Sequence, residues 1–236
     1  MARQGTDRFT QTIGFARAVD REASARGPEL AAVGGTVDPR VLELLIARLC
    51  HELSAPIAAI NNGIELLAEE DPGCLNDAMA LVGDSARRAG SSLQFYRFAY
   101  GFARGGKSAG PTPHELAVRF FDAGRITCDY PDSVQTLSPD SQKLACNLLL
   151  VGTETLPRGG RLLLTDDPLS LEAIGEAAVL TSERHAALSL TTPIAELTPR
   201  TIQAFFTGLL ARALGCRVIG TQEPGRVRLT VASTGT

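Results

Sequence analysis

RLCHELSAPIAAINNGIELL, residues 48–67, carries a clear helical pattern around one histidine, His51. In a helix, with 100° per residue, apolar side chains three or four positions apart fall on one side. The apolar seam of this segment and of the residues just before it lies within roughly 60° of the direction opposite His51. Its members are Leu42, Leu45, Ile46, Leu49, Leu53, Ile60, Ile64 and Leu67. The pattern predicts that the seam packs into a helical bundle and that His51 points away from the core.

Small side chains surround His51 on the outward face of this predicted helix. They are Ala47, Ser54, Ala55, Ala58 and Asn62, with Arg48 as the one long side chain beside them, and only Leu44 does not fit. A partner's active site reaches such a histidine easily because no large neighbour stands in the way. Imidazole is a good nucleophile near neutral pH and can carry a covalent group between two reactions. The alternative is an ordinary exposed histidine on a helix.

The position of Pro56 inside the predicted helix favours a functional site at His51. A proline inside a helix removes one backbone hydrogen bond and bends the helix, at a cost of about 3 kcal/mol or more. Here it would free the carbonyl of Glu52, which follows His51 directly. A kink that only fits the bundle is the alternative interpretation.

The string HELSAP at 51–56 resembles the H-box of two-component histidine kinases, and INNGIELL after it extends the resemblance to bacterial histidine phosphotransferases of the ChpT type. The resemblance implies that His51 is a phosphoacceptor. Arg48, one turn earlier, is then placed to neutralise phosphoryl charge, and Glu52 to orient the imidazole or tune its basicity. A solvated helix acid is the alternative for Glu52. Ala55 stands where related kinases often have Thr or Asn, so phosphatase activity should be weak.

Composition places the chain among soluble globular proteins. It has 236 residues, 44% hydrophobic and 21% charged, without an apolar run of about 18 residues. The N-terminus has no apolar signal segment, and five cysteines without CxxC spacing indicate reduced thiols. We therefore expect a cytoplasmic protein without a membrane partner. Cys50 beside His51 lacks an acidic ligand cluster, so no metal site is expected, and a net charge of −3 gives no basic field for nucleic acid.

The chain divides into a mobile leader (1–37), a helical hairpin for dimerisation and phosphoacceptance (38–104), a linker (105–112) and an α/β sandwich (113–236). Asp38 and Pro39 form a good helix start, and the first helix is predicted over 38–69. The second helix carries a bundle seam of Leu75, Met79, Val82, Ala86, Ala89, Leu93, Tyr96 and Tyr100. A hairpin alone cannot bury both seams, so we expect a homodimeric four-helix bundle.

Residues 113–236 show a mixed α/β pattern that predicts helices on one face of a mostly antiparallel sheet. We expect helices at 113–124, 139–156 and 198–214, and strands at 126–130, 161–166, 171–180, 186–190, 216–221 and 225–232. This order resembles the ATP-binding domain of histidine kinases. The resemblance rests on SQKLACNLLLVGTETLPRGGRLLL at 141–164 and LLARALGCRV at 209–218.

Departures from the kinase pattern predict a degenerate ATPase domain. Val151 and Gly152 replace the second asparagine of the kinase motif, which would hold magnesium on ATP, so only Asn147 is left. The acid-glycine motif for adenine and the glycine-rich lid are also missing. We therefore expect no bound ATP and no cofactor held by this chain, with Mg²⁺ supplied by a partner receiver domain.

A P-loop pattern, GFARGGKS at 101–108, is an alternative nucleotide site. A P-loop needs a preceding strand and a helix that opens at its Lys-Ser pair. Here a heptad pattern precedes it and AGPTP follows, so we do not favour this interpretation.

These observations predict a phosphorelay protein. The receiver domain of an upstream hybrid histidine kinase passes a phosphoryl group to His51, and the receiver domains of downstream response regulators accept it. Residues Ala47, Ser54, Ala55, Ala58 and Asn62 would form the docking face, while His114 and His185 are expected to be ordinary residues. The alternatives are an ATP-dependent histidine kinase and a non-catalytic adaptor that binds receivers.

Overall fold

The computed structural model describes residues 38–69, 74–101, 110–122 and 124–234. Its helices are α2 (Pro39–Ala68), α3 (Leu75–Tyr100), α4 (Pro113–Phe121), α5 (Asp132–Gln135), α6 (Pro139–Glu154), α7 (Ser182–Leu188), the 3₁₀ turn η2 (Ile194–Glu196) and α8 (Ile202–Ala213). The strands are β1 (Ile126–Asp129), β2 (Gly160–Asp166), β3 (Leu169–Ile174), β4 (Cys216–Glu223) and β5 (Arg226–Ser233). Across these ranges no helix is both long enough and apolar enough to cross a membrane.

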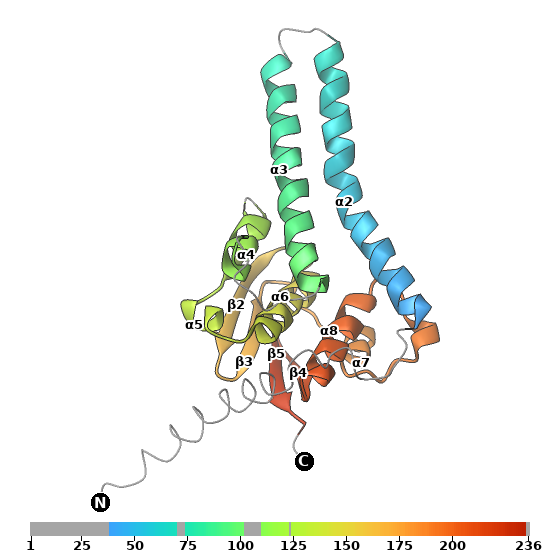
Figure 1. Ribbon diagram of the computed structural model, residues 1–236, viewed down its shortest axis with the longest axis vertical. Helices are drawn as coiled ribbons and strands as arrows, with labels where there is room; N and C mark the ends of the chain where they lie inside the picture. The colour runs from blue at the N-terminus through green and yellow to red at the C-terminus, as the bar shows by residue number, and fades with distance from the viewer. Residues whose placement is uncertain (1–37, 70–73, 102–109, 123, 235–236) are drawn as a thin grey trace, which may run out of the picture.

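α2 and α3 form a long hairpin that stands on the α/β part of the molecule (Figure 1). α2 begins as predicted: Pro39 is its first residue, and the Asp38 carboxylate accepts a hydrogen bond from the backbone N–H of Arg40. The two helices approach closely at Gly63, where an added Cβ would lie 2.6 Å from a methyl group of Val82.

The five strands form one mixed sheet in the order β1-β2-β3-β5-β4. Only the β1–β2 pair is parallel, and the other three pairs are antiparallel. Buried and more exposed residues alternate along β2, β3 and β5, which places one sheet face against the helices and leaves the other uncovered. The predicted combination of helices with a mostly antiparallel sheet is confirmed.

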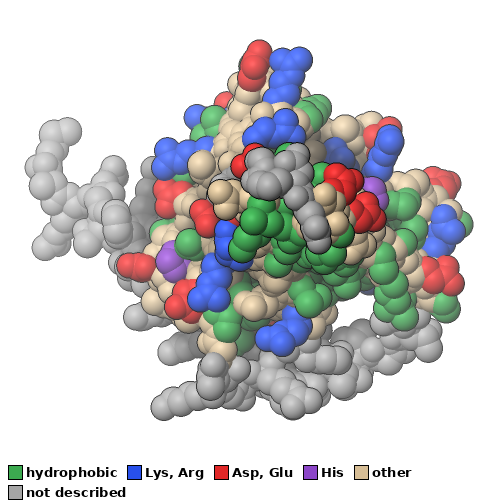
Figure 2. Space-filling model, turned by 90° about the horizontal axis from the view of Figure 1, so that it is seen from above, with side chains coloured by type: hydrophobic (Ala, Val, Ile, Leu, Met, Phe, Trp, Pro, Cys, Tyr) green, Lys and Arg blue, Asp and Glu red, His purple; other side chains and the backbone are tan. Residues whose placement is uncertain are grey.

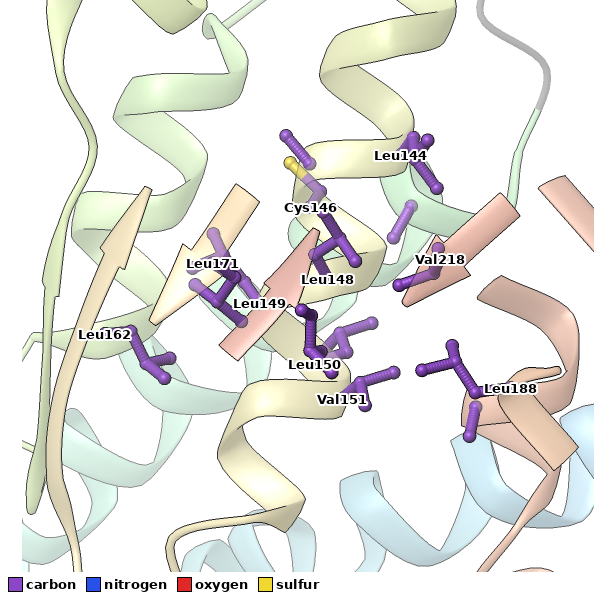
Figure 3. Close-up of a cluster of buried hydrophobic side chains, with 14 of the residues drawn as sticks. Leu144, Cys146, Leu148, Leu149, Leu150, Val151, Leu162, Leu171, Leu188 and Val218 are labelled. Atoms are coloured by element: carbon purple, nitrogen blue, oxygen red, sulfur yellow. The ribbon is translucent and has the colours of Figure 1, made fainter. Parts of the chain in front are cut away.

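α6 is the centre of the core. Leu144, Cys146, Leu148, Leu149, Leu150 and Val151 of this helix are all at most 1% exposed. They pack among Leu162 and Leu171 of the sheet and Leu188 of α7 (Figure 3). Gly152 lies so close to β2 and β3 that an added Cβ would meet a methyl group of Leu171 at 2.5 Å.

One strand prediction is wrong. Residues 186–190 belong mainly to α7, because the Thr181 side chain caps the start of a helix by accepting a hydrogen bond from the backbone N–H of Arg184. The strand predicted over 171–180 ends at Ile174, and the short helix α5 was not predicted. The predicted leader 1–37, residues 105–109 of the predicted linker and residues 102–108 of the P-loop pattern lie outside the described residues.

The predicted apolar seam of the hairpin is partly uncovered in the single chain. Leu42, Ile46 and Ile64 of α2 are 52–54% exposed, and Met79 and Leu93 of α3 are 59% and 52% exposed. Figure 2, which looks at the molecule from above, shows hydrophobic side chains reaching the surface between charged ones. Several large apolar side chains exposed on the same two helices are unusual for an isolated chain.

Hydrogen bonds fasten the hairpin to the α/β part. The buried amide of Asn147 on α6 donates to the backbone carbonyl of Ala99 at 2.8 Å, and its oxygen accepts from Gln203 of α8 at 3.0 Å. Gln203 in turn accepts from the hydroxyl of Tyr100 at 2.6 Å. On the other helix of the hairpin, Arg40 near the start of α2 donates to the carbonyls of Ile194 and Leu197 at 3.1 and 2.9 Å.

Asn147→Ala should lower the free energy of unfolding by about 1–3 kcal/mol, because buried hydrogen-bonding groups on Ala99 and Gln203 lose their partner. Thermal and urea unfolding of the variant measure this. Asn61→Ala, the same substitution at an exposed position of α2, should change stability by less than about 0.5 kcal/mol. Equal effects of the two substitutions would show that the Asn147 network does not fasten the hairpin.

Candidate phosphoacceptor site

His51 lies near the middle of α2, and its side chain is exposed. The predicted docking residues share this surface: all of them are exposed, and they are Ala47, Ser54, Ala55, Ala58 and Asn62. The Ser54 hydroxyl bonds back to the carbonyl of Cys50 at 2.7 Å, which keeps this short side chain close to the helix. The structure therefore brings the histidine and the predicted docking residues together on an open helical surface.

Arg48 differs from the exposed residues around His51 because its side chain is mostly buried. Its side chain is 9% exposed and donates a hydrogen bond from Nη1 to the carboxylate of Glu154 at the end of α6. Its Nη2 lies 3.8 Å from a carboxylate oxygen of Glu52. Glu154 also pairs with Arg184 of α7 at 3.3 Å. We call Arg48, Glu52, Glu154 and Arg184 the ionic cluster. Direct contact between Arg48 and a phosphoryl group stays a prediction, since its close partner here is a protein carboxylate.

Burial and neighbouring charges have opposite effects on the pKa values of Arg48 and Glu154 in this cluster. Burial is the largest single influence on Arg48 and lowers its pKa, but the combined effect of Glu154, Tyr100, Tyr96 and Glu52 is larger, and the net shift is upward. Burial raises the pKa of Glu154, and the guanidinium groups of Arg48 and Arg184 reduce that shift. Tyr100 packs nearby, and burial raises the pKa of its hydroxyl to about 12. This hydroxyl therefore remains protonated at neutral pH and able to donate to Gln203.

The small-residue surface continues into a cleft of about 470 Å³ between the hairpin and the α/β part. Glu52, Ala55, Pro56 and Ala59 form its α2 wall. The remaining lining comes from α3, the α4–β1 corner and the loop between α6 and β2, and includes Ser85, Arg88, Ser92, Tyr96, Phe120, Phe121, Arg125, Thr153 and Pro157. A partner that reaches His51 would therefore also meet side chains of the α/β part.

Asn147, Val151 and Gly152, which the kinase resemblance relates to a magnesium site, are engaged in other contacts or buried in this structure. The side-chain nitrogen of Asn147 bonds to the carbonyls of Ala99 and Lys143, and its oxygen to Gln203. Val151 and Gly152 are buried in the core of the sandwich. Within the described ranges, no group of three His, Cys, Asp or Glu residues is arranged to hold a metal ion.

The other two histidines lie in different settings. His114 on α4 is partly buried, and its ring lies 5.6 Å from the ring of Tyr130. His185 is exposed on α7. Neither belongs to the surface around His51 described above.

Sequence reasoning did not find Glu154 and Arg184. Glu154 is 106 residues from Arg48 in the chain, and an acid at the end of a helix is an ordinary feature of a sequence. The helical projection gave no signal for this contact, because it places Arg48 on the same face as His51.

Comparison with known proteins gives a consistent result. The family pattern "Histidine phosphotransferase C-terminal domain" matches residues 111–224. Protein phosphotransferase ChpT of Brucella abortus (strain 2308) is 32% identical over 186 residues, which are 74% of this chain and 87% of that protein. The solved structure of a bacterial phosphotransferase superposes with a TM-score of 0.67 at 27% identity, over 84% of this chain and 98% of that one. The chain therefore belongs to the ChpT-type histidine phosphotransferases, the family that its H-box region resembles.

Proposed function

We propose that His51 is the residue through which this histidine phosphotransferase carries a phosphoryl group between receiver-domain aspartates. The observation that supports this most is the exposed imidazole on a surface of small side chains, beside a cleft large enough to admit part of a partner. The partners are the receiver domain of an upstream hybrid histidine kinase and the receiver domains of downstream response regulators. All of them act on the same histidine, as a relay requires.

In the uptake step, a lone pair on an imidazole nitrogen of His51 attacks the phosphorus of an aspartyl phosphate. The bond from phosphorus to the aspartyl oxygen breaks, and the aspartate leaves as a carboxylate with the bonding electrons. The ring becomes cationic until the proton on its other nitrogen is lost. Because the transition state of phosphoryl transfer is loose, positioning and charge stabilisation supply most of the rate. The reverse sequence discharges His51 to the next receiver.

Glu52 is the residue that would stabilise the cationic ring, because its carboxylate follows His51 directly and is 40% exposed. Ala47, Ser54, Ala55, Ala58 and Asn62 form the docking face. Mg²⁺ comes with the receiver, and ATP is not a substrate. The hydrogen bonds that occupy Asn147 and the burial of Val151 support this last point. The cytoplasm, where receiver domains meet their partners, is the expected location.

His51→Ala should abolish uptake of phosphoryl groups from a phosphorylated receiver domain while the protein stays folded. His185→Ala, which removes another exposed helical histidine, is the matched control and should be labelled like the wild type. Transfer of labelled phosphate, followed on gels and by mass spectrometry, measures both. Equal labelling of His51→Ala and the wild type would rule out His51 as the acceptor.

The uncovered seam of the hairpin supports a homodimer. Leu42, Ile46 and Ile64 of α2 and Met79 and Leu93 of α3 expose apolar surface, and helical bundles close by covering such stripes with further helices. A second copy related by a twofold axis offers an identical stripe. The two hairpins then make a four-helix bundle, with each His51 on the outside.

Ile64→Glu combined with Met79→Glu should convert the dimer to a monomer, because charged groups in an apolar interface lose their hydration without gaining a partner. Light scattering coupled to size-exclusion chromatography should give twice the chain mass of 24.9 kDa for the wild type and a single chain mass for the variant. Val118→Glu on α4, where the side chain is 53% exposed, is the control and should remain dimeric. A wild-type protein of single chain mass would contradict the four-helix bundle.

A further inference from the structure

The ionic cluster lies directly beneath the surface that carries His51. It joins Arg48 and Glu52 of α2 to Glu154 of α6 and Arg184 of α7. The side chains of Arg48 and Glu154 are only 9% and 10% exposed. Two cations and two anions therefore meet close to the proposed phosphoacceptor, with Arg48 one helical turn before His51 and Glu52 directly after it.

Stability alone is a weak explanation for this cluster. Removing charges from water is expensive, and a buried ion pair often stabilises a protein no more than apolar side chains of the same volume do. Apolar contacts would hold α2 against α6 and α7 equally well. The position of the cluster, next to Glu52 and His51, is better explained by the transfer reaction.

Arg48 is shared unequally between two carboxylates. It donates a hydrogen bond to Glu154, whereas its distance of 3.8 Å to Glu52 is too long for one. Glu52 remains 40% exposed and lines the cleft beside His51. Glu154 has a second cation, Arg184, at 3.3 Å, so its charge is held in place from two sides. In this arrangement Glu154 is the closer counterion of Arg48, and Glu52 forms the longer and more exposed pair.

We infer that Glu154 is a positioning residue for phosphotransfer, which binds Arg48 and thereby leaves the carboxylate of Glu52 available to the imidazole of His51. Without a negative charge at position 154, Arg48 would close onto Glu52, an i,i+4 pair that helix geometry favours. Glu52 would then be neutralised and drawn away from the ring that becomes cationic in the transfer step. Glu154 itself makes and breaks no covalent bond. The inference rests on the proposed role of His51.

Glu154→Gln tests this, since glutamine keeps the size of the side chain and an acceptor oxygen but lacks the charge. The full chain is mixed with a receiver domain phosphorylated by acetyl phosphate, and initial rates over a range of receiver concentrations give kcat and KM. We expect kcat to fall about tenfold, part of the ~10²-fold that a well-placed acid–base group contributes, with KM changed less than about twofold. An unchanged kcat, or a raised KM at full kcat, would overturn the inference, because the latter result indicates docking alone.

A double-mutant cycle shows whether Glu154 acts through Glu52. In a Glu52→Gln background, Glu154→Gln should cause no further loss of kcat, since the carboxylate that it protects is already gone. Equal losses in both backgrounds would contradict the inference.

Two further variants separate charge from packing. Glu154→Asp keeps the charge and should retain a clearly higher kcat than Glu154→Gln; equal values for the two would overturn the inference even if both proteins are less stable. Glu172→Gln is the matched control, because Glu172 on β3 is 19% exposed and also pairs with two arginines, Arg226 and Arg228, but faces the uncovered side of the sheet. Its kcat should equal that of the wild type.

The outcomes also distinguish this inference from the proposed function. If the wild type is labelled at His51 and Glu154→Gln has full kcat, only the role of Glu154 is wrong. If the wild type takes up no phosphoryl group at His51, the proposed function itself is wrong.

Discussion

The helix α2 has three functions, and each of them uses a different side of the helix. One side, which includes Gly63, packs closely against α3. A second side, with Leu42, Ile46 and Ile64, is apolar and uncovered in the single chain. The third side carries His51 among small residues. Because each helical residue points in one direction only, a reactive side chain stays accessible only if the residues for packing and pairing keep to the other two sides.

The α/β part of the molecule holds the helical hairpin in place through polar side chains of α6. Asn147 of α6 is bonded to the end of α3 and to α8. Glu154, at the end of the same helix, takes the guanidinium of Arg48. Two polar side chains of α6 are therefore used to position the hairpin. The result is a cleft with walls from both parts of the chain next to the histidine.

Local chemistry made much of the fold predictable from the sequence. The Asp38-Pro39 start, the helical periodicity and the strand alternation of β2 and β5 are signals that neighbouring residues carry by themselves. The prediction failed at 186–190, where the sequence AALSL is too short to distinguish a strand from the capped helix that forms there.

The site residues also fall into two groups, those that the sequence predicts and those that it does not. His51 and the small residues beside it lie within four turns of one helix, so a helical projection was enough to group them. Arg48 was placed on the open surface because the projection contains no α6, and its partner Glu154 comes from a distant part of the chain. Contacts of this kind are set by tertiary packing, and a single sequence does not carry them.

The most direct test of the central claim is the site of phosphorylation on the wild-type chain. The protein is charged by a phosphorylated receiver domain, kept at neutral to alkaline pH and analysed by phosphorus NMR and by fragmentation mass spectrometry. Our account predicts one phosphoryl group per chain, bonded to a ring nitrogen of His51. A phosphoryl group on His114, His185 or a carboxylate, or a chain that remains unmodified, would contradict it.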